Sequence, residues 1–373
     1  MGFRPFYLAA SLFAAASIAL WALQYAGAVS PLLRGAAWHG HEMLFGFALA
    51  VIAGFLFTAV RNWTQRPTPR GAALAAIVGL WLAARILVLT PFGIASAIVN
   101  AAFPLAVAAG IAVPLIASGN RRNYFFIALL AACSAGTLAF HLSALGVLPW
   151  DEGAILQCGL DVVLFVVTVV AGRVIPMFTN NGVPGAGAQR KPWAERAALG
   201  GVLAVLLLDA IGAPRALIGI ACAVAAAANL ARWILWRPWK TPRAPLVWSL
   251  HAAYAWIPIH FAMRIAALDG LIAPQWATHA LTVGTIGGMT LAMMTRTARG
   301  HSGRPLVAGR AEVACYALVH AAALVRVFGG ILLPTLYVGT IVAAACCWSA
   351  AFATYAIAYW PILTRPRIDG QPG

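Results

Sequence analysis

The chain has 373 residues, of which 62% are hydrophobic and only 9% are charged. Soluble domains carry roughly 25% charged residues, so the composition excludes a soluble globular protein. Apolar runs of membrane-spanning length recur from end to end, which is typical of an all-α polytopic membrane protein. The formal net charge of +16 would indicate a nucleic-acid partner in a soluble protein. Here most basic residues lie between apolar runs, so we expect contacts with anionic membrane lipid and no nucleic acid.

The apolar runs predict twelve transmembrane helices. We expect a single integral membrane domain over residues 1–373, with a short tail from about residue 361. No small-residue cleavage pattern follows the first run, so we expect a retained helix rather than a removed signal. The cysteines fall inside apolar runs without a C-x-x-C pair and are interpreted as small core residues. The predicted spans are 6–28, 41–60, 72–90, 94–116, 124–146, 153–177, 196–212, 215–236, 244–268, 275–296, 310–330 and 334–360.

The distribution of basic residues predicts the orientation of these spans. With twelve spans, both termini and the even-numbered loops lie on one side of the membrane, and 19 of the 25 basic residues belong to that side. The opposite loops hold only Arg34 and Arg215. By the positive-inside rule the first side is cytoplasmic. We therefore expect both termini in the cytoplasm.

Polar groups inside the spans gather at one depth. Spans two and ten run inward and begin at His41 and His279, so both histidines lie at the outer end. Ionisable groups inside a membrane are costly and indicate functional sites. Asp161 of span six lies just below this layer. The outer layer comprises His39, His41, Glu42, His141, His260, His279, Arg85, Arg264 and Arg326.

His41 and His279 are the candidate haem ligands. Two imidazoles at the same depth on facing helices can bind one haem iron, since neutral imidazole nitrogen is a good iron ligand. Haem propionates need cations, and Arg85, Arg264 and Arg326 lie at a suitable depth to supply them. The alternative for each histidine is a buried ring that is hydrogen-bonded to a helix carbonyl, and we favour this alternative for His141 and His320.

His39 and Glu42 belong to the same motif, but we predict different roles for them. His39 and His41 are two residues apart and point to different faces of a regular helix. His39 is therefore a candidate ligand for a second metal, together with His260. Glu42 lies three residues after His39 and is expected to orient a ligating ring by hydrogen bonding.

A weak internal repeat relates spans two and ten. Span two has Gly46 and Arg61 at five and twenty residues after His41, and span ten has Gly284 and Arg299 at the same offsets after His279. Span six has no histidine at its start. Because spans two, six and ten are four apart, the pattern suggests three four-helix units.

Seven motifs are spread along the chain from end to end. They are F-R-P-F-Y-L at 3–8, W-H-G-H-E-M-L-F-G-F at 38–47, A-G-F-L-F-T-A-V-R-N-W at 53–63, G-R-V-I-P-M-F-T-N-N at 172–181, W-S-L-H-A-A-Y-A-W-I-P at 248–258, H-A-L-T-V-G-T-I-G-G-M-T-L-A-M-M-T-R at 279–296 and G-H-S-G-R-P at 300–305. Together these motifs resemble the NnrS family of haem- and copper-containing bacterial membrane proteins. The resemblance implies a bacterial inner-membrane protein of twelve spans, linked to nitric oxide stress and holding haem, in particular haem b, and copper.

Two functions follow as hypotheses. The first is a haem-binding membrane protein that protects against nitric oxide or a nitrosyl species, with quinol or another electron donor as a further partner. Haem–copper oxidases also place haem ligands on spans two and ten, but this chain lacks their histidine pair on span seven, so the likeness concerns the fold alone. The second hypothesis is a cofactor-free transporter or channel that uses buried His, Arg and Asp residues as a proton or anion path.

Overall fold

The computed structural model describes residues 1–29 and 35–371, which fold into an all-helical bundle. Within these ranges the helices form twelve rods, which confirms the predicted number of helices. The predicted break at residues 212–214 separates the seventh rod from the eighth. The rods are α1 (Phe3–Tyr25); α2 (Gly35–His41), η1 (Glu42–Ala48) and α3 (Leu49–Thr64), together called rod two; α4 (Gly71–Leu87); α5 (Gly93–Ala117); α6 (Phe125–Ala144); α7 (Glu152–Gly182); α8 (Pro192–Ala210); α9 (Arg215–Leu235); α10 (Pro245–Leu268); α11 (Pro274–His279), η4 (Ala280–Gly287) and α12 (Gly288–His301), together called rod ten; α13 (Arg310–Leu324), η5 (Val325–Gly329) and α14 (Gly330–Leu332); and α15 (Tyr337–Thr364).

The outer surface of the bundle is apolar. In the described part of the chain, eight rods are long and apolar enough to cross a membrane. Large apolar side chains within the rods point outward, with Val113 71%, Ile220 63% and Ile357 76% exposed. Exposing such side chains to water would be unfavourable, whereas lipid tails accept them. The chain is therefore a multi-pass membrane protein.

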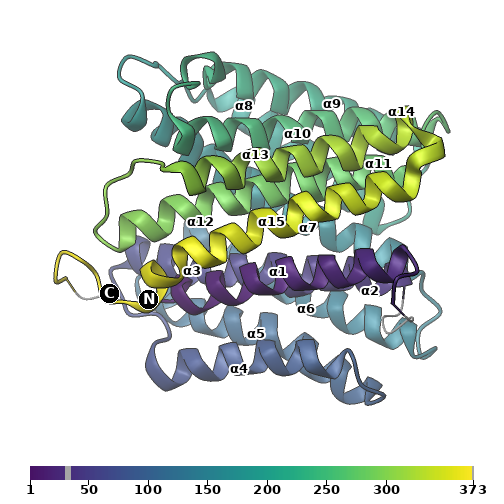
Figure 1. Cartoon of the computed structure of the whole chain (residues 1–373), viewed down its shortest axis with the longest axis horizontal. Coiled ribbons are helices and arrows are strands. Elements are labelled where there is room, and N and C mark those ends of the chain that lie inside the picture. Colours follow the sequence, from purple (N-terminus) through teal and green to yellow (C-terminus); the bar gives the residue numbers. More distant parts are fainter. Residues whose placement is uncertain (30–34, 372–373) are drawn as a thin grey trace.

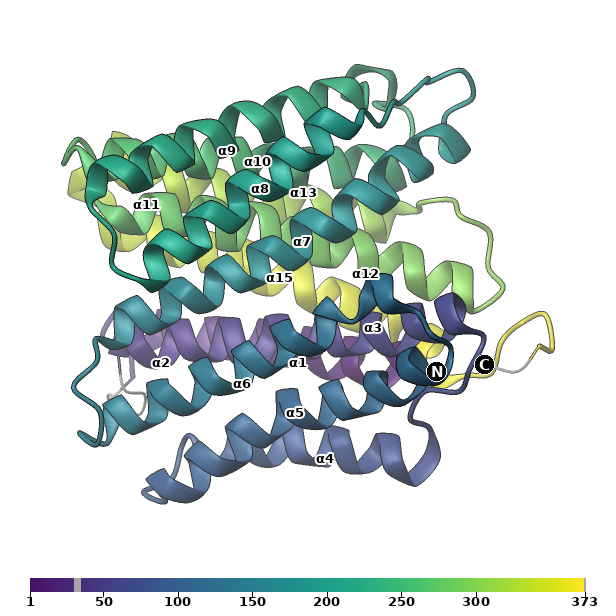
Figure 2. The ribbon, with the colours of Figure 1, turned by 180° about the vertical axis from the view of Figure 1, so that it is seen from behind.

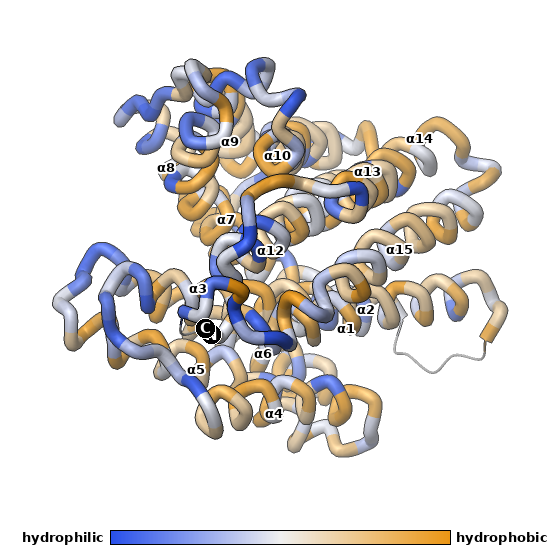
Figure 3. The backbone as a smooth tube through the Cα atoms, turned by 60° about the vertical axis from the view of Figure 1, so that its left-hand side comes forward, coloured by the Kyte–Doolittle hydropathy of each residue, from blue (hydrophilic) through white to orange (hydrophobic). Residues whose placement is uncertain are grey.

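The hydrophilic connections between helices and both termini lie at one end of the bundle. The N- and C-termini lie close together in Figure 1. Figure 3 shows hydrophilic residues gathered in the connections at that end. This arrangement agrees with the predicted grouping of the termini and the even-numbered loops on one side. Arg34, which was assigned to the opposite side, lies outside the described residues.

Rod two lies in the interior of the bundle. Figures 1 and 2 show α4 and α5 at one edge and α8 and α9 at the other, while α1 packs along α15. The apolar window of rod two is 78% buried, against at most 61% for the other seven rods of membrane-spanning length. Both α2 and η1 also contact α7. The polar residues of rod two therefore face protein rather than lipid.

Candidate functional site

Rods two and ten both change from α-helix to π-helix directly after a histidine. In rod two, η1 follows His41, and in rod ten, η4 follows His279. The π-helix is rare and is found frequently at functional sites. The two rods therefore share a backbone feature at the positions where the sequence repeat aligned them.

Steric constraints explain why the repeat has glycine at these two positions. A Cβ atom on Gly46 would collide with the guanidinium of Arg85, and a Cβ atom on Gly284 would collide with the indole of Trp256. Trp81 also approaches this turn and donates its indole N–H to the Gly46 carbonyl at 2.9 Å. Each widened turn thus receives a large side chain from a neighbouring rod.

A cavity of about 410 Å³, called the large cavity, lies between rods two and ten. Rod two contributes His39, Met43 and Phe47, and α15 contributes Trp348. Most of the remaining lining is aliphatic or aromatic, and it comes from α1, α7, rod ten and α15. An apolar cavity with few polar groups is the usual form of a site for a large organic ligand or cofactor.

His39 and His279 face each other in the large cavity. Their ring centroids are 6.4 Å apart and their planes differ by 11°. An imidazole nitrogen binds a first-row metal at about 2.0–2.1 Å, so two rings on opposite sides of one ion have centroids roughly 6 Å apart. The separation of the two rings therefore fits one metal ion between them.

Hydrogen bonds fix the ring nitrogen that His279 can offer. Its Nδ1 lies 2.7 Å from the Gln275 carbonyl oxygen, which can only accept, so Nδ1 carries the proton and Nε2 keeps a lone pair. His39 stacks on Trp21 with centroids 5.3 Å apart and planes 4° apart. Its Nδ1 is buried and has no hydrogen-bond partner among the described residues. Both rings thus have a nitrogen available to a ligand.

Arg326 brings positive charge to the large cavity. Its guanidinium carbon lies 5.6 Å from the Trp276 ring. Within the described part of the chain, Arg326 forms no ion pair with a carboxylate, and its Nη1 is buried without a hydrogen-bond partner. A ligand that carries an acidic group would satisfy this nitrogen.

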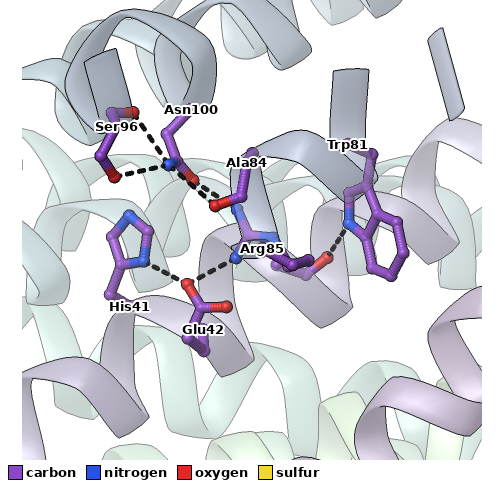
Figure 4. A network of polar contacts seen from close by, with 8 residues as sticks. His41, Glu42, Trp81, Ala84, Arg85, Ser96 and Asn100 are labelled. Carbon is purple, nitrogen blue, oxygen red and sulfur yellow. Dashed lines mark hydrogen bonds and ion pairs between the residues drawn. The ribbon is translucent and has the colours of Figure 1, made fainter. Parts of the chain in front are cut away.

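His41 lies on the other side of rod two, in a separate polar network (Figure 4). The Glu42 carboxylate accepts from His41 Nδ1 at 2.8 Å and from Arg85 Nη1 at 2.6 Å. Arg85 also donates to Asn100, whose amide donates to the Ser96 carbonyl at 2.9 Å. All of these side chains are buried. Because Arg85 neutralises Glu42, the carboxylate stays ionised and holds the His41 ring in one orientation.

His141 packs against His41. The two ring centroids are 4.7 Å apart, and the rings are nearly perpendicular at 76°. Both rings line a second cavity of about 180 Å³, called the small cavity, together with Trp38, Ser96 and Glu152. The alternative favoured for His141, a buried ring that is hydrogen-bonded to a helix carbonyl, stays a prediction, and the structure adds that this ring lines the small cavity.

Arg264 is bound to carboxylates. It donates from both terminal nitrogens to Asp209, at 2.8 and 3.0 Å, and its Nη1 lies 3.6 Å from Asp161. Gln157 donates to the same Asp161 oxygen at 3.0 Å. An arginine held in this way is already neutralised and has little capacity left for a propionate.

The structure corrects the expected pairing of the histidines. It brings His279 to His39 rather than to His41, because residues two apart on a helix point in nearly opposite directions. His41 meets His141 instead, and Glu42 orients His41 rather than His39.

The expected propionate-binding arginines and the expected accessory ligands also lie in different parts of the bundle. Of the three expected arginines, all of them in the described part of the chain, Arg326 alone lines the large cavity, while Arg85 and Arg264 are neutralised by carboxylates. His260 contributes to neither cavity: its Nδ1 donates to the Ala277 carbonyl at 2.7 Å, and its buried Nε2 has no partner within residues 1–29 and 35–371.

Sequence reasoning missed three residues that complete these networks. Asn100 and Asp209 are the partners of Arg85 and Arg264. Each lies inside an apolar run, which was an available signal for both. Trp21, which stacks on His39, had no comparable signal, because aromatic residues are common in membrane helices.

The comparisons with known proteins identify the family. Among the described residues, no group of three or more His, Cys, Asp or Glu side chains forms a metal cluster. No curated protein matches the chain. The model of one family, described as NnrS protein, matches residues 1–367. The chain therefore belongs to the NnrS family of membrane proteins, which is associated with the response to nitric oxide.

Proposed function

We propose that this protein binds haem in the large cavity and acts in resistance to nitric oxide or nitrosative stress. The observation that carries the proposal is the facing pair His39 and His279, with 6.4 Å between ring centroids in an apolar cavity. Thiolate ligands are not available there, because no cysteine is among the described residues that line the large cavity. His39 and His279 would hold a b-type haem through their imidazole nitrogens.

Each residue of the large cavity has a proposed role. His279 presents Nε2 because its Nδ1–H is held by the Gln275 carbonyl. His39 faces it and is kept in orientation by the stack on Trp21. Arg326 is the proposed partner of a propionate, since its Nη1 has no protein acceptor within the described ranges. The haem would supply iron that exchanges single electrons, and this redox chemistry would act in resistance to nitric oxide or another nitrosyl species.

The proposed setting is the inner membrane of a bacterium, with both termini in the cytoplasm. The basic residues support this orientation through the positive-inside rule. The large cavity would then lie in the outer half of the membrane. Quinol or another donor on that side would deliver electrons.

We also propose a distant likeness to the core of haem–copper oxidases, with three four-helix units. The support is the common π-helix after His41 and His279, on rods two and ten. The chain of α7, the sixth rod, contains no histidine. A second metal, copper, belongs to the proposal as well, and its residues are argued in the next subsection.

The test is haem quantification on purified full-length protein by the pyridine haemochrome method and by the Soret band. We expect one b-type haem per chain, and loss of most haem in His39→Ala and in His279→Ala. His251→Ala is the matched control, because His251 is a buried histidine that bonds Thr179 at 2.8 Å. Cofactor-free protein that carries protons or anions across liposome membranes would instead establish a transporter.

A further inference from the structure

The small cavity contains polar groups that haem binding does not use. It has a volume of about 180 Å³ and is lined by His41, His141, Trp38, Ser96 and Glu152, among others. It lies on the face of rod two opposite to His39. None of the described residues lines both cavities. A ligand in the large cavity therefore cannot satisfy the polar groups of the small one.

His41 directs a lone pair into the small cavity. Glu42 is ionised, because it accepts from Arg85 at 2.6 Å, so the His41 nitrogen that contacts it, Nδ1, must donate. The other ring nitrogen, Nε2, is then an acceptor. Figure 4 shows it turned away from Glu42. It is buried on a residue that is 1% exposed, and it has no partner in the described part of the chain.

A buried hydrogen-bond donor without an acceptor in the described residues also lines the small cavity. Trp38 is 6% exposed, and its indole N–H is buried without an acceptor in residues 1–29 and 35–371. An indole N–H can only donate. Leaving a buried polar group unpaired costs about 1–3 kcal/mol, so one bound species that both accepts electron density from His41 and accepts a hydrogen bond from Trp38 would be favourable.

The two imidazoles have a separation that suits one metal ion. Nitrogen–metal bonds of about 2.0–2.1 Å, at roughly a right angle to each other, place two ring centroids about 4–5 Å apart. The His41 and His141 centroids are 4.7 Å apart. The contact from Glu42 to His41 Nδ1 is the arrangement that commonly orients a metal-binding histidine and makes it more basic.

We propose that the small cavity binds one copper ion through His41 Nε2 and the His141 ring, with a metal-bound water or small anion accepting from Trp38. Imidazole nitrogen suits several first-row ions, and copper binds most tightly in their stability order. Zinc prefers four ligands, whereas the described lining of the small cavity offers two imidazoles, one carboxylate from Glu152 and no cysteine. The inference deepens the copper part of the proposed function, and it can fail without affecting the haem assignment.

The experiment uses purified full-length protein that is stripped with a chelator and reloaded with copper or with zinc. Metal per chain is measured by mass spectrometry, and nitrogen coordination is measured from the hyperfine structure in the electron paramagnetic resonance spectrum of Cu(II). We expect one copper per chain with nitrogen ligands, and loss of that copper in His41→Ala and in His141→Phe. Glu42→Gln should weaken copper binding by about 10–100-fold, since Glu42 only positions His41.

The large-cavity variants provide the decisive comparison. His39→Ala and His279→Ala should keep the copper while losing haem, and His141→Phe should keep haem, which also shows that it folds. Unchanged copper in both small-cavity variants would overturn the proposal, as would parent protein that binds no copper and therefore holds only water there. Copper that disappears with His39 or His279 instead would place the metal in the large cavity and would also overturn it.

Discussion

The two faces of rod two carry different chemistry. On the His39 face, the large cavity is apolar, and its cation, Arg326, pairs with no carboxylate in the described residues. On the His41 face, the charges of Glu42 and Arg85 are neutralised within the protein. The first face suits a bulky apolar ligand with an acidic group, and the second suits a small ion held by a preoriented ring. His39 and His41 are only two residues apart in the sequence, yet they belong to two different sites because they lie on opposite faces of one helix.

The largest expected effect comes from breaking the ion pair on the His41 face. Arg85→Ala leaves Glu42 buried and uncompensated, which should lower the free energy of unfolding by about 3–5 kcal/mol. Thermal unfolding of the purified protein measures this loss. Arg326→Ala is the control on the other face and should cost much less, because it leaves no carboxylate unpaired. The double change Glu42→Gln with Arg85→Met should recover much of the stability. Equal losses in Arg85→Ala and Arg326→Ala would contradict the distinction between the faces.

A second effect should appear only in the large cavity. Arg326→Gln removes a charge-assisted hydrogen bond worth about 1.5–3 kcal/mol, so haem should be held about 10–150-fold more weakly. The rate and extent of haem transfer to apomyoglobin measure this change. Arg173→Gln is the matched control, since Arg173 bonds Asn123 at 2.7 Å and lines neither cavity. Haem retention that is the same in Arg326→Gln and in the parent would remove Arg326 from the site.

The smallest effect tests the widened turns themselves. Gly46→Ala and Gly284→Ala each force a Cβ atom against a packed side chain, which should cost about 1–3 kcal/mol of stability. Gly79→Ala in α4 is the control, because a Cβ atom there meets nothing within 4 Å. Melting temperatures in detergent compare the three. If Gly46→Ala matches Gly79→Ala, the close approach of Arg85 does not constrain the turn.

Much of the architecture was predictable because it depends on local properties. The length and spacing of apolar runs predicted twelve helices, and the described residues form twelve rods. The motif at residues 38–47 and its counterparts predicted the NnrS family, which the match over residues 1–367 confirms. The sequence analysis assigned all four histidines to one layer of the membrane. In the structure His39 contacts His279 and His41 contacts His141, so each pair does lie at a common depth.

The orientation of each side chain around its rod could not be predicted in the same way. Depth follows from position along the chain, at about 1.5 Å per residue, but the facing direction depends on how each rod is rotated against its neighbours. The π-helices η1 and η4 add to the difficulty, because a wider turn changes the direction of the residues around it. The sequence by itself therefore determined which residues share a layer, while tertiary packing alone decided that His39, and not His41, faces His279.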